Sequence, residues 1–388
     1  MKNRIYTIPV RIFSCFLVLL VCCTSCRQGS LSKTHHTAKT GSEAVLYAKG
    51  FNIDNYEGYK ILRIYSGVGA AMDTTQYVLL QKGVKAPEGF NKAQQIEVPV
   101  TRMVTTASSH IAMAEFAGVI DAIVGLGSFK YVNSLALRKN IADGKVQEIG
   151  IDGTMNEEVL ITMKPELLIV MGNQELNFKR YATLTNAGIP VLVNSEWLER
   201  SPLGRAEWVK VMAALTNTEP LVQSKFDTLE REYKQLVAIG KKAKTKPLTI
   251  TALPYKGIWN VPDGDSYAAK LYKDAGVRYK WLDYRGTGSL SLSFETVAPE
   301  ALKADFWLDF GYVDSKKEIK AIDPRYADFK PFKNGNLYNN NNRVNDLGSN
   351  DYWESGVVKP QLILADLIKI FHPELLPDHQ LVYYKQLK

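Results

Sequence analysis

The sequence predicts an α/β protein in which two α/β segments are joined by one long helix. Short apolar runs alternate with helix-like runs between residues 103 and 193, and the same alternation returns between residues 248 and 371. Buried strands separated by helices are typical of a parallel sheet covered on both faces. Residues 203–240, between the two segments, carry apolar side chains at a helical period, which predicts the connecting helix.

The chain is long enough for two domains of ordinary size, and we divide it into five parts. They are a signal segment (1–26), a flexible tether (27–44), an N-terminal α/β lobe with a strand-rich extension (45–202), a linker-helix region (203–245) and a C-terminal α/β lobe (246–388).

The signal segment begins with basic residues, continues as an apolar run over residues 12–23, and ends with two small residues before Cys26. The apolar run is too short to span a bilayer comfortably and has the length of a secretory signal core. This order is that of a lipoprotein signal, although Cys23 stands where leucine is usual. We expect cleavage before Cys26, lipid attachment to it, and a periplasmic, membrane-anchored location; a signal-anchor helix is the alternative.

The cysteine positions support this prediction. All four cysteines lie within the first 26 residues, so the folded part holds none for a disulfide framework or a zinc site. Residues 27–42 are polar and nearly free of apolar side chains, which predicts a tether rather than a packed element.

The first lobe is expected to start with the strand-rich extension, where residues 59–65, 76–80 and 96–100 are rich in β-forming residues. After it, Ser108 is suited to cap a helix and Gly188 to end one. The expected strands are 103–105, 122–126, 167–171 and 189–193, and the expected helices are 108–117, 156–163 and 178–187.

The linker helix is predicted from an apolar stripe that includes Phe226, Leu229 and Tyr233. Pro220 suits its first turn and Gly240 its end. In the second lobe the expected strands are 248–253, 306–310 and 336–338, and the expected helices are 266–275, 294–302 and 359–371.

One element occurs in both lobes. Residues 155–170 and 293–308 each start with a polar residue and a glutamate, form a short helix, and reach an apolar strand through a Pro-acidic or Ala-Asp pair. Residues 104–110 with 119–126, and 264–267 with 274–276, add to the pattern. Together they resemble the substrate-binding proteins of ABC importers for iron-siderophore complexes, haem and cobalamin, whose two lobes enclose a ligand cleft and are joined by a rigid helix.

The resemblance implies a binding protein without a resident cofactor or metal and without catalytic residues. It would capture an iron chelate, a siderophore complex or haem, and deliver it as a monomer to an ABC permease and its ATPase. In that family each lobe presents a glutamate to the permease, and by motif position these are Glu158 and Glu295, with Glu157 an alternative to Glu158. Both are also ordinary acidic residues at helix starts.

Family members hold the ligand between aromatic and a few polar side chains at the lobe interface, beyond strand ends. We favour Trp259, expected in a loop after a strand, and Arg205, suited to a ligand carboxylate. The full set of candidates is His110, Tyr131, Trp197, Arg205, Tyr255, Trp259, Tyr267, Trp281 and Trp353. For each residue alone, a structural role is an equal alternative.

Other function classes find less support. The net charge of +8 is spread along the chain, three of its basic residues lie in the signal segment, and no dense basic block predicts nucleic-acid binding. The sequence contains no G-x-S-x-G, Walker or HExxH motif. Three alternatives stay open: a corrinoid-binding member of the same family, a chelatase-like protein using His110, and a lipoprotein displayed on the cell surface. Residues 45–100 and the Asn-rich residues 336–350 depart from a minimal family member.

Overall fold

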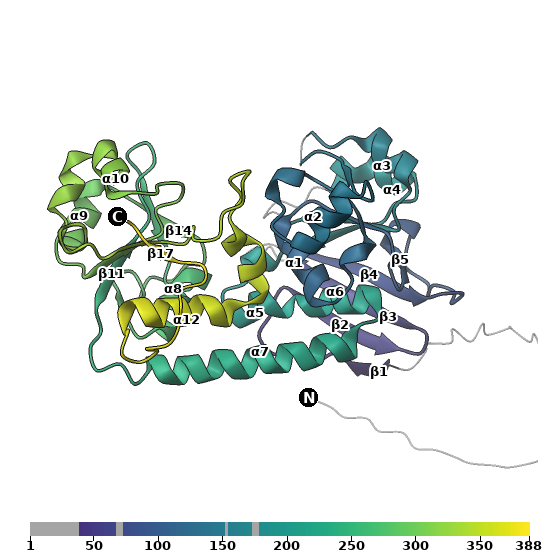
Figure 1. Ribbon diagram of the computed structural model, residues 1–388. Helices are drawn as coiled ribbons and strands as arrows, with labels where there is room; N and C mark the ends of the chain where they lie inside the picture. The colour runs from purple at the N-terminus through teal and green to yellow at the C-terminus, as the bar shows by residue number, and fades with distance from the viewer. Residues whose placement is uncertain (1–38, 67–72, 152–153, 173–177) are drawn as a thin grey trace, which may run out of the picture. The chain divides into compact units, whose positions relative to one another are not determined.

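The computed structural model describes residues 39–66, 73–151, 154–172 and 178–388, within a folded unit that spans Ala38–Lys388. The signal segment, Cys26 and the tether up to residue 38 lie outside the described residues. Figure 1 shows the two lobes of this unit and the long helix α7 that runs beneath both. None of the described helices is both long and apolar enough to cross a membrane.

The strand-rich extension is a five-stranded sheet in sequence order, antiparallel except for its last, parallel pair. Its strands are β1 (Lys39–Ser42), β2 (Phe51–Tyr56), β3 (Tyr59–Ser66), β4 (Asp73–Gln81) and β5 (Gln95–Val98). Strand β1 lies in residues that we expected to belong to the flexible tether, and it pairs with β2. One face, with Ile53, Leu62 and Tyr77, joins the main hydrophobic core. The Tyr77 hydroxyl donates to the Val191 carbonyl at 2.9 Å, which ties the extension to the first lobe.

The first lobe is a parallel sheet in the order β10-β9-β6-β7-β8. Its strands are β6 (Met103–Thr105), β7 (Ile123–Leu126), β8 (Gln147–Glu148), β9 (Leu167–Met171) and β10 (Val191–Asn194), and its helices are α1 (Ser108–Phe116), α2 (Leu135–Ala142), α3 (Glu157–Met163) and α4 (Ala182–Asn186). The expected strands are present; α2 and β8 were not expected. Because all strands run the same way, their carboxyl ends share one edge, where ligands bind in open α/β sheets.

Three helices join the lobes: α5 (Pro202–Glu207), α6 (Val209–Thr216) and α7 (Glu219–Gly240). The break lies at Asn217, whose positive φ of 54° ends α6, and Pro220 stands in the first turn of α7. The predicted stripe on α7 is buried at Val222, Phe226, Leu229 and Tyr233. Through it α7 packs on α6 of the linker and α12 of the second lobe.

The second lobe has a sheet in the order β13-β11-β15-β16-β17, parallel except for β17, and a separate hairpin of β12 and β14. Its strands are β11 (Leu248–Thr251), β12 (Trp259–Pro262), β13 (Arg278–Tyr279), β14 (Ser289–Leu292), β15 (Phe306–Leu308), β16 (Leu337–Asn339) and β17 (Lys385–Gln386). Its helices are α8 (Tyr267–Asp274), α9 (Phe294–Ala301), α10 (Lys316–Ile322), α11 (Lys330–Asn334) and α12 (Pro360–Phe371).

Candidate ligand-binding cleft

Two adjoining hollows lie where the lobes meet. The larger, about 540 Å³, is lined by Ser108 and Tyr131 from the first lobe and by Tyr312, Asn341 and Ser349 among others from the second. We call it the amide chamber. Its walls contain residues of both lobes, so a molecule held there would contact both.

The smaller hollow, about 340 Å³, is lined by Trp197 and Glu199 from the first lobe and by Tyr267, Tyr272 and Tyr352 among others from the second. We call it the tyrosine chamber. The two chambers share the residues Asp309, Asn340 and Trp353. They therefore form one cleft whose halves meet at these three side chains.

Asp309 is the shared acidic residue, placed directly after β15. Its φ of 63° puts a non-glycine residue in the left-handed region, a strained conformation that is frequent at functional sites. Its carboxylate accepts hydrogen bonds from the hydroxyls of Tyr272 (2.6 Å), Tyr384 (2.9 Å) and Thr251 (3.0 Å). Desolvation raises the pKa of Asp309, and these three donors oppose the rise by stabilising the charged form.

The asparagine run that begins at the end of β16 supports the amide chamber, and we call it the asparagine floor: Asn340 and Asn341 line the chamber, and Asn339 precedes them in the chain. Fully buried Asn339 accepts from the Phe310 N–H and donates to the carbonyls of Gly311 and Val313. It thereby fixes the loop that carries Asp309. Asn341 donates to Asp314 at 3.1 Å, while its own carbonyl oxygen is buried without a partner. These contacts give the Asn-rich stretch a physical role that the sequence did not reveal.

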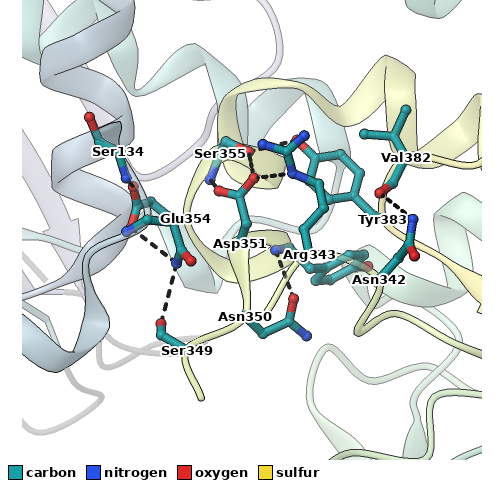
Figure 2. A network of polar contacts seen from close by, with 12 residues as sticks. Ser134, Asn342, Arg343, Ser349, Asn350, Asp351, Glu354, Ser355, Val382 and Tyr383 are labelled. Atoms are coloured by element: carbon teal, nitrogen blue, oxygen red, sulfur yellow. Dashed lines mark hydrogen bonds and ion pairs between the residues drawn. The ribbon is translucent and has the colours of Figure 1, made fainter. Parts of the chain in front are cut away.

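Residues 342–358 cross from the second lobe toward the first, and we call them the strap (Figure 2). Within it, Asp351 pairs with Arg343 at 2.7 Å and accepts from the Ser355 hydroxyl at 2.8 Å. The Ser355 hydroxyl also lies 2.8 Å from that of Tyr383, near the C-terminus. This network holds the strap against the second lobe.

Glu354 joins the strap to the first lobe (Figure 2). Its carboxylate accepts from the backbone N–H groups of Asn133 and Ser134, each at 2.7 Å, where Ser134 caps α2. Asn345 adds a bond from its side chain to the Val132 carbonyl at 3.0 Å. Only 2% of Glu354 is exposed, and burial raises its pKa to about 7 despite the two backbone donors.

A second carboxylate connects the cleft with the extension. Glu199, which lines the tyrosine chamber, accepts from the N–H groups of Lys49 and Gly50 and from the Trp208 indole. Nearby, the fully buried Glu207 accepts from the backbone of residues 46–48 and from Lys210. The segment between β1 and β2 of the extension is thus bound by two acidic side chains.

Comparison with known proteins agrees with this geometry. Residues 103–343, more than half of the chain, match the family model described as periplasmic binding protein. This chain belongs to the periplasmic binding protein family. Two curated relatives from Methanocaldococcus jannaschii are uncharacterized lipoproteins. One is 29% identical to this chain, in an alignment that covers 87% of this chain and 83% of the relative. The other is 26% identical, in an alignment that covers 93% of this chain and 91% of the relative.

Solved structures of the same fold also come from periplasmic proteins. A possible iron-binding protein from Staphylococcus epidermidis has a TM-score of 0.55 at 16% identity, covering 71% of this chain and 99% of that one. The haem-binding protein HutB of Vibrio cholerae has a TM-score of 0.53 at 17% identity, covering 68% and 98%. The vitamin B12-binding protein BtuF of Vibrio cholerae has a TM-score of 0.51 at 14% identity, covering 72% and 99%.

Four of the candidate residues lie in the cleft of this periplasmic binding protein. Tyr131 and Trp353 line the amide chamber, and Trp197, Tyr267 and again Trp353 line the tyrosine chamber. Arg205 lines neither chamber; its guanidinium lies 5.3 Å from the ring centre of Tyr267 and 3.8 Å from Glu196, and its buried Nε has no hydrogen-bond partner.

The other candidates lie elsewhere. Trp259 is in β12, not in a loop, and is fully buried between Trp307 and Phe329, so its prediction as a ligand contact is wrong. Trp281 is also in the core. His110 is fully buried in α1, where desolvation lowers its pKa. Tyr255 is 71% exposed in the turn before β12 and lines neither chamber.

Sequence reasoning missed Asp309, the asparagine floor and Glu354. Asp309 was placed inside an expected strand over residues 306–310, which in the structure ends at Leu308. Its polar character at the end of an apolar run was the available signal, because site residues in parallel sheets follow the strands.

Glu158 and Glu295 occupy equivalent positions. Each is the second residue of its helix, α3 or α9, and each helix is capped by the side chain of a preceding residue, Asn156 or Ser293. Both glutamates are exposed, whereas Glu157 is half-buried. Backbone N–H bonding at the helix start lowers the pKa of Glu295, so it stays negatively charged at neutral pH.

Proposed function

We propose that this protein is the substrate-binding component of an ABC importer and that it carries an iron chelate, a siderophore complex or haem, to an inner-membrane permease. One observation supports the proposal above all: in this periplasmic binding protein, residues of both lobes line a single cleft. Proteins of similar fold include a possible iron-binding protein, a haem-binding protein and a vitamin B12-binding protein, and another belongs to an Fe³⁺-hydroxamate transport system.

The cleft supports a ligand of moderate size. Chambers of about 540 and 340 Å³ are in the range of sites that enclose drug-sized molecules. Tyr131, Trp197 and Trp353, each 39–51% exposed, offer aromatic surface to such a ligand. A corrinoid is bulkier than either chamber, so it would need the strap to move away, and we rank it second.

Delivery is proposed to use Glu158 and Glu295 as permease contacts, one on each lobe, because paired exposed carboxylates can orient docking on basic residues. Lipid attachment at Cys26 would keep the protein on the periplasmic side of a membrane, as a monomer that engages the permease and its ATPase. We propose no chemical change of the ligand, since His110, the candidate for a chelatase-like role, offers no exposed surface to a ligand.

The test is a fluorescence titration of residues 27–388 with ferric siderophores, haemin and cyanocobalamin. Trp197 and Trp353 lie in the cleft, so a bound iron chelate should quench them saturably at micromolar or lower concentration. Recovery of the ligand unchanged would support binding without catalysis. Failure of every chelate to bind would overturn the proposal.

A further inference from the structure

We propose that the cleft selects chelates that carry no net negative charge and that present hydrogen-bond donors to the protein, such as neutral or cationic ferric hydroxamates. This inference rests on the proposed function and narrows its ligand class. Three independent features of the chamber walls lead to it: the balance of charges, the hydrogen-bonding capacity left over, and the exposed aromatic faces.

The charges around the cleft favour the acidic side. In the amide chamber, Lys385 pairs with Asp314 at 2.6 Å, which leaves the charge of Asp309 without a cationic partner among the described lining residues. In the tyrosine chamber the described lining contains Glu199 and Asp309 and neither lysine nor arginine. An anionic ligand would lose its hydration beside these carboxylates without a matching charge.

Arg205 does not reverse this balance. Its guanidinium lies 3.8 Å from Glu196 and 5.3 Å from the ring centre of Tyr267, and Arg205 is not among the residues that line either chamber. Glu196 is only 1% exposed, so removing Arg205 from it would leave a buried carboxylate with less compensation. Its positive charge is therefore paired with that of Glu196 within the protein, while its buried Nε has no hydrogen-bond partner.

Several accepting atoms of the walls keep free capacity for hydrogen bonds. Asn341 is about nine-tenths buried, and its carbonyl oxygen has no partner while its amide already donates to Asp314. The hydroxyls of Tyr272 and Tyr384 already donate their hydrogen bonds to Asp309, so they can only accept further hydrogen bonds. Asp309 itself accepts three bonds and has room for about one more. A ligand that supplies N–H or O–H groups would satisfy these atoms.

The aromatic walls point the same way. Tyr131, Tyr312 and Trp353 are 47%, 96% and 51% exposed, and all three line the amide chamber. Aromatic faces carry partial negative charge and attract cations. Together with Asp309 they would favour an ammonium group over a carboxylate at the same place on a ligand.

The experiment uses one ferric chelate in three charge forms. Ferrioxamine B carries a free ammonium group, its N-acetyl derivative is neutral, and its N-succinyl derivative ends in a carboxylate. Titrated into the protein at pH 7.5 and low salt, the ammonium and acetyl forms should bind at least tenfold more tightly than the succinyl form. The difference should narrow at high salt, because screening weakens charge interactions. Equal or tighter binding of the succinyl form would overturn the inference.

Variants of the protein test which residue causes the discrimination against the anionic chelate. Asp309→Asn keeps the size of the side chain and removes its charge, so the affinity of the protein for the succinyl form should rise toward that for the other two forms. Glu158→Gln, on the exposed start of α3, is the control and should leave all three affinities unchanged. A thermal melt shows whether Asp309→Asn is folded. If it is not, Asn341→Leu, which removes an accepting oxygen, should weaken the ammonium and acetyl forms.

Two further probes separate this inference from the proposed function. If haemin, a dianion, is preferred over all ferrioxamines, the charge inference fails and the proposed function stands. If cyanocobalamin is the sole ligand, the neutral and cationic ferrioxamines have failed to bind, so the iron-chelate proposal and the inference about ferric chelates both fail. If none of the probes binds, the proposed function itself fails and the inference falls with it.

Discussion

The carboxylate of Glu354 in the second lobe accepts a hydrogen bond of 2.7 Å from the backbone N–H of Ser134 at the start of α2 in the first lobe. A second bond of the same length comes from Asn133. The negative charge lies at a helix N-terminus, which favours it, but its burial costs more, and the pKa rises to about 7. We therefore expect the contact between the lobes to depend on pH.

The first prediction concerns Glu354→Gln. A carboxyl whose folded-state pKa is about 7, against an ordinary 4.5, binds its proton more tightly in the folded state. Its stabilising effect is complete below pH 4.5 and is lost as the pH rises through 7, by about 3 kcal/mol, as 1.36 kcal/mol for each pKa unit gives. The glutamine variant should lack this loss.

The measurement is the free energy of unfolding in urea at pH 5 and at pH 8, for the wild type and the variant. Glu158→Gln makes the same chemical change at an exposed site and should leave the wild-type pH dependence intact. If the free energy of unfolding changes equally with pH in the wild type and in Glu354→Gln, then Glu354 is not the titrating group.

The second prediction tests the floor of the amide chamber. Asn339→Ala removes a fully buried side chain that bonds Phe310, Gly311 and Val313, and it leaves these backbone groups without partners. Each buried unsatisfied group costs about 1–3 kcal/mol, so we expect a loss of about 3 kcal/mol in unfolding free energy and weaker ligand binding through the displaced Asp309 loop.

The matched control is Asn342→Ala, three residues along the same run. Asn342 is exposed and donates to the carbonyls of Leu381 and Val382 at 3.3 and 3.1 Å, as Figure 2 shows for Val382. Its loss should cost about 1 kcal/mol or less. Equal destabilisation by the two substitutions, measured by urea unfolding, would contradict the role assigned to Asn339.

The third prediction concerns the attachment of the extension. Glu207→Ala removes a fully buried carboxylate that binds the backbone of residues 46–48, and it leaves Lys210, itself 5% exposed, without its acidic partner and with only the Ala44 carbonyl to accept from it. Breaking a buried ion pair costs about 3–5 kcal/mol. Faster cleavage by a protease in residues 39–50 should accompany the lower stability. Glu232→Ala, at an exposed position of α7, should leave both properties near wild type; unchanged proteolysis of Glu207→Ala would refute the fastening role.

The sequence predicted the elements that depend on neighbouring residues. The apolar stripe of α7 was found because its members recur within a few residues of one another, and the strands β6, β7, β9 and β10 because each is a continuous apolar run. The helix α2 was missed, since its eight residues, LALRKNIA, bury only Leu137 and Asn140 and give a weak period.

The cleft was harder to predict because its residues meet across the chain. Trp259 lies in the core because β12 pairs with β14, about thirty residues further along the chain. No local sequence pattern predicts that pairing. Asp309 depends on Tyr384, which lies 75 positions away, and Glu354 depends on a turn 220 positions before it. Aromatic character identified Tyr131, Trp197, Tyr267 and Trp353, but it did not separate them from Trp259 and Trp281.

The fourth prediction tests the proposed permease contacts. The double variant Glu158→Ala with Glu295→Ala should bind its ligand like the wild type, because both side chains are exposed at helix starts and line neither chamber. Transport should be abolished, since each lobe loses the carboxylate that would meet basic residues of the permease. Uptake of ⁵⁵Fe by membrane vesicles or reconstituted transporter, alongside a ligand titration, measures the two effects separately. The matched control compares Glu157→Ala with Glu158→Ala, each as a single variant: equal loss of uptake would show that the first-lobe contact is not specific to Glu158. If the double variant loses ligand affinity, Glu158 and Glu295 belong to the binding site instead.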